Sequence, residues 1–359
     1  MGGGEPSLRS MEEFNSALLH SGVSSVSFDG SPFTWTNGRV WQRLDRVLIN
    51  AEWSAAYSFT RLSHLSRGRS DHCPLLIKCG HFQGRKSTFR FLNVWRHHKE
   101  FIDVVKQDWD QPIASSGMQG FFLKLMRLRK RLSVWNKETF GNVANKVKEA
   151  ADVLLARELE YDQQRDEASK SRLNEARAKH TRMLALESEF WRQKSSVKWL
   201  QAGDANTAYF HSVVPHKRNV NFIGRIKDSS ENWIENLDDI KSSAVEFFSN
   251  LFKSDEVGSA VPSFSFQLPQ VSQLDNDMLQ AIPSLEKLRE VVFSLDVDST
   301  AGPDGFGAMF YQTCWEIIHQ DLMSAVSDFF KGMALPRGFT STMIVLIPKK
   351  EGASHWKDF

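Results

Sequence analysis

The sequence predicts an α+β fold built from two or three folding units. Short strand-like runs separated by turn residues occupy the first 82 residues, whereas helical periodicity dominates from about residue 95 to 200. Helices and turns alternate in the rest of the chain. The 359 residues are 41% hydrophobic and include 26 Phe and 11 Trp, which is enough apolar material for packed cores.

The first region contains a strong turn signal. Asn37-Gly38 separates two strand-like runs, residues 31–36 and 39–49, and predicts a tight hairpin in which both central residues have positive φ. Residues 74–78 predict a further strand. Because the apolar residues of that strand are consecutive, we expect it to be covered on both faces.

The middle region predicts two or three long helices folded into an antiparallel hairpin. Breaks are expected at residues 141–142 and 167–171. Apolar residues recur at spacings of three and four, and such stripes are typical of a core rather than of a cofactor site. They are Phe121, Leu125, Leu128, Leu132, Trp135, Val143, Val147, Leu154, Leu155, Leu159, Leu173, Met183, Leu186 and Phe190.

The last third predicts smaller elements joined by polar stretches. In order, they are a connector at 200–225, a hairpin of 222–227 with 231–234, a helix at 238–252, a linker at 253–272, a helix at 284–295, a turn at 302–305, a helix at 308–330 and a strand at 343–347. The predicted regions of the whole chain are 1–82, 83–200, 201–272 and 273–359.

Charge is distributed unevenly. The net charge is only +2, but residues 121–200 carry 18 Lys and Arg against 11 Asp and Glu, and residues 225–300 carry 6 against 14. A basic block suggests a surface that faces nucleic acid. Two ordinary solvated helical surfaces would explain the same asymmetry.

Two features bear on location and covalent links. No apolar run approaches the roughly 20 residues of a membrane span, and no signal peptide is evident, so we expect a soluble intracellular protein without membrane partners. The three cysteines lack zinc-type spacing. We therefore expect no disulfide framework, no disulfide-linked partner and no metal knuckle.

An acid and a histidine lie side by side in Ser70-Asp71-His72. A histidine that handles a proton must hold one tautomer, which a carboxylate on its other nitrogen enforces. Asp45, predicted in the middle of a strand, is available for that role. Asp71 is placed to contact a divalent metal or its water shell. The alternative is a polar strand-end turn, with Asp45 paired to Arg43 or Arg46.

Several motifs occur together in a recognisable order. FTWTNGRVWQRLDRVLIN followed by SDHCPLLI resembles the carboxy-terminal part of the endonuclease/exonuclease/phosphatase family, which includes the endonuclease domain of LINE-type retrotransposons. KWLQAGDANTAYFH, residues 198–211, is similar to the block that links endonuclease and reverse transcriptase in plant LINE-type (non-LTR) polyproteins. AGPDGF and IVLIPKK, with Cys314-Trp315 and Leu335-Pro336, resemble the opening fingers segment of that reverse transcriptase.

The resemblance implies an architecture and a site. The fold would be a partial four-layer α/β sandwich, a long helical hairpin linker and partial reverse-transcriptase fingers. His72 would be the catalytic histidine of the nuclease, Asp45 the acid that orients it and Asp71 the acid beside it. Mg²⁺ as cofactor, DNA or RNA as partner and a nuclear location are also implied. Nucleic-acid contacts would come from Arg43, Arg69, Lys349 and Lys350.

The chain also departs from the family pattern. The family's metal-binding Glu, Asn and Asp-x-Asn belong before Met1, and the polymerase palm aspartates belong after Phe359, so we expect no complete metal site and no bound Mg²⁺. Enzymatic activity is therefore left open, and we expect a truncated, catalytically inactive retrotransposon protein. One alternative is a non-catalytic nucleic-acid-binding protein that uses the basic helices. The other is an inert, aggregation-prone product. The sequence makes no prediction of the oligomeric state.

Other polar residues are expected to be structural. Asp204, Asn206 and His211 match no metal-ligand spacing, and the GDANT segment is a helix-start signal. Asp304 lies in a Gly-Pro-Asp-Gly turn, where an Asp accepts local backbone hydrogen bonds. Surface and core roles are expected for His97, His98, Trp95 and Trp109.

Overall fold

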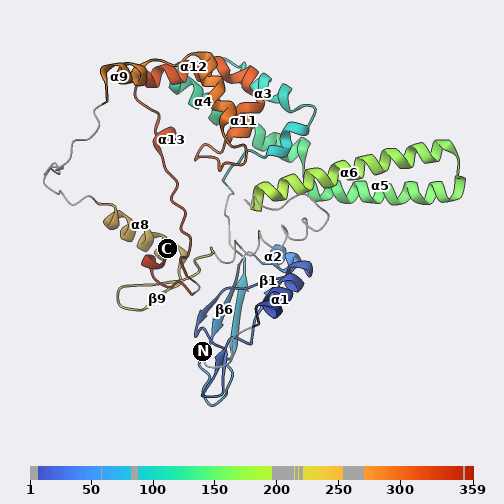
Figure 1. The fold of residues 1–359 in the computed structure, drawn as a ribbon, viewed down its shortest axis with the longest axis vertical. Helices are drawn as coiled ribbons and strands as arrows, with labels where there is room; N and C mark the ends of the chain where they lie inside the picture. Colours follow the sequence, from blue (N-terminus) through green and yellow to red (C-terminus); the bar gives the residue numbers. More distant parts are fainter. Residues whose placement is uncertain are drawn as a thin grey trace. The chain divides into compact units, whose positions relative to one another are not determined.

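The computed structural model describes residues 7–57, 59–81, 88–195, 214, 217, 221–253, 271–350 and 352–359. They fall into two compact units. The first unit contains Met1–Arg85, Gly203–Leu268 and Val345–Phe359, and the second contains Lys86–Ala202 and Pro269–Ile344. Each unit therefore combines segments that are distant in sequence (Figure 1).

The first unit contains small sheets rather than one large one. In its three-stranded sheet, β6 (Phe59–His64) lies between β2 (Phe28–Gly30), which is parallel to it, and β7 (Leu75–Gly80), which is antiparallel. Two antiparallel pairs accompany it: β1 (Ser24–Ser25) with β5 (Leu48–Ile49), and β3 (Trp35–Thr36) with β4 (Trp41–Gln42). The buried residues of this part are Val26, Phe28, Ile49 and Leu62.

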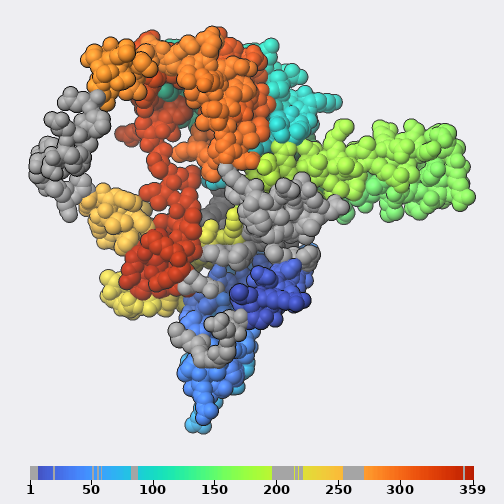
Figure 2. All heavy atoms as spheres, in the orientation of Figure 1, coloured from blue at the N-terminus to red at the C-terminus, as the bar shows by residue number. Residues whose placement is uncertain are grey.

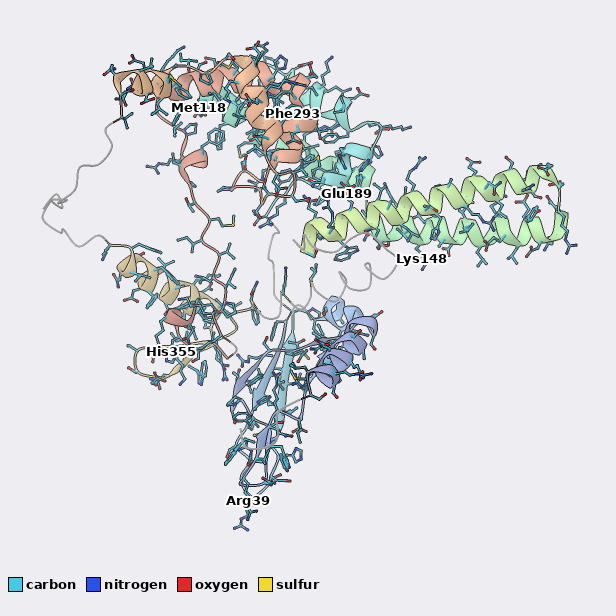
Figure 3. The ribbon with its side chains drawn as sticks, in the orientation of Figure 1. Arg39, Met118, Lys148, Glu189, Phe293 and His355 are labelled. Carbon is cyan, nitrogen blue, oxygen red and sulfur yellow. The ribbon has the colours of Figure 1, made fainter. Side chains whose placement is uncertain are left out.

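The predicted hairpin at Asn37-Gly38 is confirmed, because β3 pairs with β4 across it. The prediction for its backbone is only half right, since Gly38 has a positive φ of 83° and Asn37 does not. The loop has four residues and is closed by the Asn37 side chain. Its Oδ1 accepts hydrogen bonds from the backbone N–H groups of Arg39 (3.0 Å) and Val40 (2.8 Å), and Arg39 lies at the tip (Figure 3).

The strand predicted at residues 74–78 is present as β7, but the expected coverage on both faces is wrong. Leu76 is 40% exposed and Ile77 is 45% exposed. β7 is the last strand of its sheet and pairs with β6 alone. A run of apolar residues reveals strand propensity, whereas coverage depends on which other segments pack against the sheet.

Two helices of the first unit were not predicted. α1 (Leu8–His20) and α2 (Ala51–Ala56) lie in the region that was expected to contain only strands and turns. Asn50 caps α2 by accepting a hydrogen bond from the Trp53 N–H, so the missed signal was a standard N-cap residue.

A second core of this unit forms around the predicted small hairpin. β8 (Ile226–Lys227) pairs with β9 (Trp233–Ile234), and α8 (Leu237–Leu251) matches the helix predicted at 238–252, so both predictions are confirmed. Ile226, Ile240 and Trp356 form this core with residues of α8 and of the short helix η3 (Trp356–Asp358).

The strand predicted at residues 343–347 is wrong. These residues form no strand in the described parts of the chain, and Ile344 and Val345 are 60% and 62% exposed. A strand requires a neighbour whose N–H and C=O groups complete the ladder. High β propensity alone does not supply one.

The second unit is helical. Its described elements are η1 (Asn93–His97), α3 (Phe101–Trp109), α4 (Gly117–Trp135), the π-helical turn η2 (Asn136–Phe140), α5 (Val143–Gln164), α6 (Glu167–Ser195), α9 (Gln273–Gln280), α10 (Leu285–Ser294), α11 (Ala308–Thr313), α12 (Trp315–Phe330) and α13 (Arg337–Thr340). The helix predicted at 308–330 is thus divided at Cys314. α9 was not predicted, although Ser272 and Asp275 form a capping box at its start.

α5 and α6 confirm the predicted helical hairpin (Figure 1). The break at 141–142 is also confirmed. The second break lies at Arg165, which has a left-handed φ of 53°, and the predicted break at 167–171 is instead the first turn of α6.

The apolar stripe of α4 forms the main core of the second unit. Phe121, Leu125, Leu128, Leu132 and Trp135 are all buried there, which confirms their prediction as core. They join a large aromatic cluster that contains Phe91, Trp95, Phe101, Trp109, Phe306 and Phe310. On α5 the prediction fails for two residues, because Leu155 and Leu159 are 58% and 55% exposed.

Candidate functional site

Thr34 organises the segment that contains the predicted acid and histidine. Its side chain is completely buried, and its Oγ1 accepts hydrogen bonds from the N–H groups of Leu44 (3.0 Å) and Asp45 (2.9 Å). Its carbonyl accepts a 2.7 Å hydrogen bond from the Cys73 N–H. One threonine therefore links the segment that contains Asp45 to the segment that contains His72.

Asp45 and His72, which are 27 residues apart, contact each other directly. His72 Nδ1 lies 2.8 Å from Asp45 Oδ2, and the side chains are 46% and 34% exposed. The hydrogen bond from His72 lowers the pKa of Asp45 and outweighs the opposing effect of burial, and Thr34 lowers it further. The ionised carboxylate favours the His72 tautomer that carries its proton on Nδ1.

The placement of Asp45 differs from the sequence-based expectation. It lies between β4 and β5, not in the middle of a strand. Its position comes from Thr34 rather than from a sheet ladder. The guanidinium of Arg43 lies over the Phe28 ring, 4.0 Å from its centroid, and the Asp45 carboxylate contacts His72.

Asp71 stabilises the same region by contacts to β3. We call this region, formed by Thr34, Asp45, Asp71 and His72, the Asp45–His72 corner. Its Oδ2 accepts a 3.0 Å hydrogen bond from Trp35 Nε1, and its carbonyl accepts a 3.0 Å hydrogen bond from the Thr36 N–H. His72 lies opposite Trp35 in an isolated antiparallel bridge. Asp71 therefore holds the turn against β3.

The described part of the corner contains two carboxylates that a magnesium ion could use, and both also make other contacts. Mg²⁺ prefers an octahedral set of oxygen ligands, usually including one or two carboxylates. Here Asp71 already binds an indole N–H and Asp45 binds an imidazole. Within the described ranges, no three His, Cys, Asp or Glu side chains group as a metal site requires.

The four predicted nucleic-acid contacts come from two segments of the first unit. Arg69 is exposed in the turn that precedes His72, in the same part of the first unit as Arg43. Lys349 and Lys350 instead contact the carboxy-terminal turn. Lys350 Nζ lies 2.8 Å from Asp358 Oδ1, and Lys349 Nζ donates to the Lys357 carbonyl at 3.1 Å.

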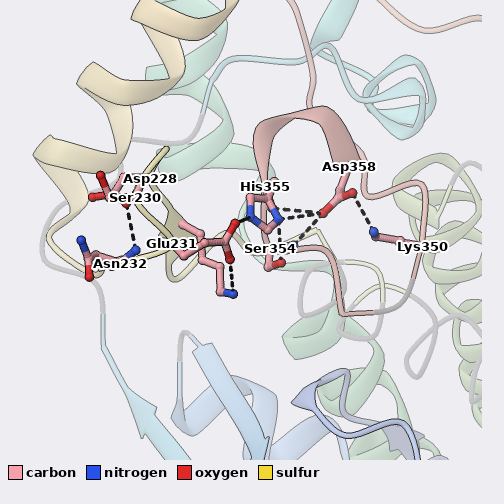
Figure 4. Close-up of polar contacts among 9 residues, drawn as sticks. Asp228, Ser230, Glu231, Asn232, Lys350, Ser354, His355 and Asp358 are labelled. Atoms are coloured by element: carbon pink, nitrogen blue, oxygen red, sulfur yellow. Dashed lines mark hydrogen bonds and ion pairs between the residues drawn. The ribbon is translucent and has the colours of Figure 1, made fainter.

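A polar cluster around His355 was not predicted (Figure 4). His355 Nε2 lies 2.9 Å from Glu231 Oε1, and Nδ1 lies 3.1 Å from Ser354 Oγ. Asp358 accepts hydrogen bonds from the N–H groups of Ser354 and His355. The cluster joins the β8–β9 turn to the carboxy-terminal turn. Its only local sequence signal is the spacing of His355 and Asp358, and Glu231 is 124 residues away.

The contacts of this cluster predict how the stability of the first unit depends on pH. Hydrogen bonds from Lys227 and then His355 lower the pKa of Glu231 to about 2. A lowered folded-state pKa stabilises the fold above the ordinary value, near 4.3, and this contribution is lost as the pH falls toward 2. Burial raises the pKa of Asp358, but the Lys350 contact and backbone donors outweigh it and lower the pKa overall, so Asp358 acts in the same direction.

We therefore expect Glu231→Gln to open the β8–β9 region at pH 7 and to weaken its acid sensitivity. Hydrogen exchange of residues 221–253 between pH 7 and 2 would measure this. Glu246→Gln, an exposed change on α8, should leave both exchange and pH dependence unchanged. Equal behaviour of the two variants would contradict the role of the cluster.

Asp304, His97 and His98, which were expected to have structural roles, contact neighbouring side chains or backbone groups. The Asp304 carboxylate accepts hydrogen bonds from the Tyr311 hydroxyl and the Phe306 N–H, each at 3.4 Å, and its burial raises its pKa. His97 Nε2 lies 2.8 Å from Glu189 Oε2, and His98 packs edge-on against Trp135. Residues 198–211, with Asp204, Asn206 and His211, lie outside the described residues.

Two further findings concern the wider chain. Cys73, Cys79 and Cys314 are free thiols, and Cys79 is exposed. In the parts that the structure describes, no helix is both long and apolar enough to cross a membrane.

Comparisons with known proteins identify one relationship. No protein-family model matches the chain. Over 158 residues, it is 24% identical to the Transposon TX1 uncharacterized 149 kDa protein of Xenopus laevis. The chain is related to a transposon-encoded protein. The matched segment is 44% of this chain but only 12% of the Xenopus protein, so the chain corresponds to a small part of that relative's length.

Proposed function

We propose that the chain is a LINE-type retrotransposon protein with a nuclease-like first region and a reverse-transcriptase-like last region, and that alone it does not nick DNA. The transposon relative and the order of the motifs support the family. The 2.8 Å contact between Asp45 and His72 is the observation that supports a nuclease-like first region, because an orienting acid makes this contact with a catalytic histidine.

The pair can position a proton but lacks the rest of a hydrolytic site. With its Nδ1 proton bound by Asp45, His72 presents Nε2 as the nitrogen that can accept or donate a proton. Such a group typically contributes about 10²- to 10⁴-fold to a rate. Phosphodiester hydrolysis also needs an activated water, which a bound Mg²⁺ would supply, and the two carboxylates beside His72 already contact Trp35 and His72 itself.

A nicking assay tests this proposal. Supercoiled plasmid with Mg²⁺ should remain intact at background level with the wild-type chain and with His72→Ala. Asp45→Asn is the third sample, and circular dichroism would verify that all three proteins fold. Nicking by the wild-type chain that disappears in His72→Ala would show that the site is active and would overturn the proposed inactivity.

A second candidate function is binding to nucleic acid without catalysis, and α4 supports it. The helix has five cations and no carboxylate. Asp321 pairs with Lys124 at 2.7 Å, and Asp108 pairs with Arg127 at 3.3 Å. Lys130 and Arg131 are exposed, and neither forms an ion pair or side-chain hydrogen bond within the described residues. Among the helices of residues 121–200, α4 is therefore the one that we propose as the binding surface.

The salt dependence of the DNA-binding constant shows whether the α4 cations contact phosphates or are only solvated. Each phosphate neutralised on duplex DNA lowers log K by about 0.9 per tenfold increase in salt. We expect Lys130→Glu/Arg131→Glu to reduce that slope by about 2 in fluorescence anisotropy with labelled duplex DNA. Lys179→Glu/Arg182→Glu on α6 applies the same charge change as a control. An unchanged slope for the α4 variant, or equal loss in both, would exclude α4 as the binding surface.

A further inference from the structure

The sheet that contains β6 and β7 contacts the β8–β9 hairpin within the first unit. Phe59 of β6 stacks on Phe222, which precedes β8, with ring centroids 5.3 Å apart. Arg61 Nη1 also donates to the Gly224 carbonyl at 3.5 Å. The β8–β9 hairpin, yellow in Figure 2, lies at the surface in that view. These contacts bring side chains that are more than 150 residues apart in sequence to one place.

β6 and β7 place two cations directly opposite each other. Arg61 and Lys78 are partners in the antiparallel register of the two strands. Like charges at such a pair repel each other and destabilise the ladder. The two positive charges therefore favour an anion close to both of them.

The β8–β9 hairpin adds a third cation and an aromatic ring. Side chains alternate between the two faces of a strand, and Ile226 and Ile234 belong to the hydrophobic core. The opposite face therefore carries Arg225, Lys227, Trp233 and Glu235. The Arg225 guanidinium lies over the Trp233 ring, 3.7 Å from its centroid, and pairs with Asp29 of β2. Trp233 is nevertheless 38% exposed.

The Glu235 carboxylate lies between these three cations. Its Oε1 accepts a 3.1 Å hydrogen bond from Arg61 Nη2 and lies 3.7 Å from Arg225 Nη1. Its Oε2 lies 4.0 Å from Lys78 Nζ, and the side chains of Glu235 and Lys78 are 48% and 51% exposed. Of these three distances, the first alone is within hydrogen-bond range. One carboxylate thus faces three cations from three segments and is hydrogen-bonded to one of them.

We propose that these cations bind a phosphodiester of single-stranded nucleic acid and that Glu235 competes with it. We call this the Arg61–Arg225 site, formed by Arg61, Lys78, Arg225, Trp233 and Glu235. A phosphate offers more acceptor oxygens than a carboxylate, and guanidinium groups match its geometry. An unpaired base stacks on the exposed part of the Trp233 indole, whereas the bases of a duplex are already stacked on each other. The site goes beyond the function proposed above, because it includes neither the Asp45–His72 corner nor α4.

Fluorescence anisotropy of the full chain with labelled oligothymidylate tests the proposal. Glu235→Gln keeps the shape of the side chain and removes the competing charge. The dissociation constant should therefore fall at least about threefold. Glu246→Gln, an exposed change on α8, removes the same charge elsewhere in the first unit and should leave the constant unchanged. An unchanged or weaker affinity of the Glu235→Gln chain would overturn the proposal.

Two further variants should lose affinity. Lys78→Gln, a change at a half-exposed side chain, should weaken binding at least about threefold. Trp233→Ala should weaken binding of the single strand at least about fivefold and leave binding of a duplex of the same length unchanged. Circular dichroism verifies the fold, and Lys78→Gln carries the test if Trp233→Ala does not fold. An unchanged affinity of Lys78→Gln, or equal losses of single-strand and duplex binding in a folded Trp233→Ala chain, would contradict the assignment.

The Lys130→Glu/Arg131→Glu background separates this site from α4. In that background Glu235→Gln should tighten binding of the oligothymidylate by at least the same factor as in the wild-type chain. A failure of α4 as a binding surface would leave this result intact. Loss of the Glu235→Gln effect in the α4 variant would instead show that the binding belongs to α4, and would overturn the Arg61–Arg225 site.

Discussion

Leu128→Ala is expected to lower the free energy of unfolding of the second unit by about 2–5 kcal/mol. Leu128 is completely buried on α4, one turn from Leu125 and Leu132, which are also completely buried. The surrounding cluster is rich in aromatic side chains, which cannot collapse easily into the space left by three missing carbon atoms. The cost therefore includes a cavity as well as lost burial.

Urea unfolding followed by hydrogen exchange of residues 101–140 would measure the loss. Leu123→Ala is the matched control, because the same substitution on the same helix removes a side chain that is already 36% exposed. It should cost less than about 1.5 kcal/mol. Similar losses at residues 123 and 128 would mean that α4 does not present this face to the core.

Thr34→Val is expected to destabilise the Asp45–His72 corner by about 2–4 kcal/mol. Valine has nearly the same shape as threonine but accepts no hydrogen bond. The N–H groups of Leu44 and Asp45 would lose their acceptor in a partly buried position. The loss should also release the 2.8 Å contact between Asp45 and His72, because Thr34 positions the backbone of Asp45.

Two readouts separate stability from positioning. Hydrogen exchange of residues 41–49 reports the opening of the segment, and imidazole NMR reports the tautomer of His72. Thr36→Val is the control, because its hydroxyl accepts from the Gly38 N–H in an exposed turn. If Thr34→Val altered neither exchange nor the tautomer population, the role assigned to Thr34 would be wrong.

Local structure was the most predictable part of this protein. The β3–β4 hairpin followed from Asn37-Gly38, and the helix predicted at 284–295 is α10, whose N-cap Ser284 accepts from the Lys287 N–H. In both cases the decisive hydrogen bonds join residues within about four positions. The pairing of His72 with Asp45 spans 27 residues, and its expectation depended on chemical reasoning and on a family resemblance.

The sequence by itself determined the helical hairpin, the apolar stripe of α4 and the small β8–β9 hairpin, because helical and strand periodicities are encoded over neighbouring residues. Only the tertiary structure decided that β7 is exposed, that residues 343–347 lack a strand partner in the described parts and that Thr34 places Asp45 outside any strand. Coverage, ladder pairing and ion pairing all depend on segments that are distant in sequence, and no local pattern specifies which of them meet.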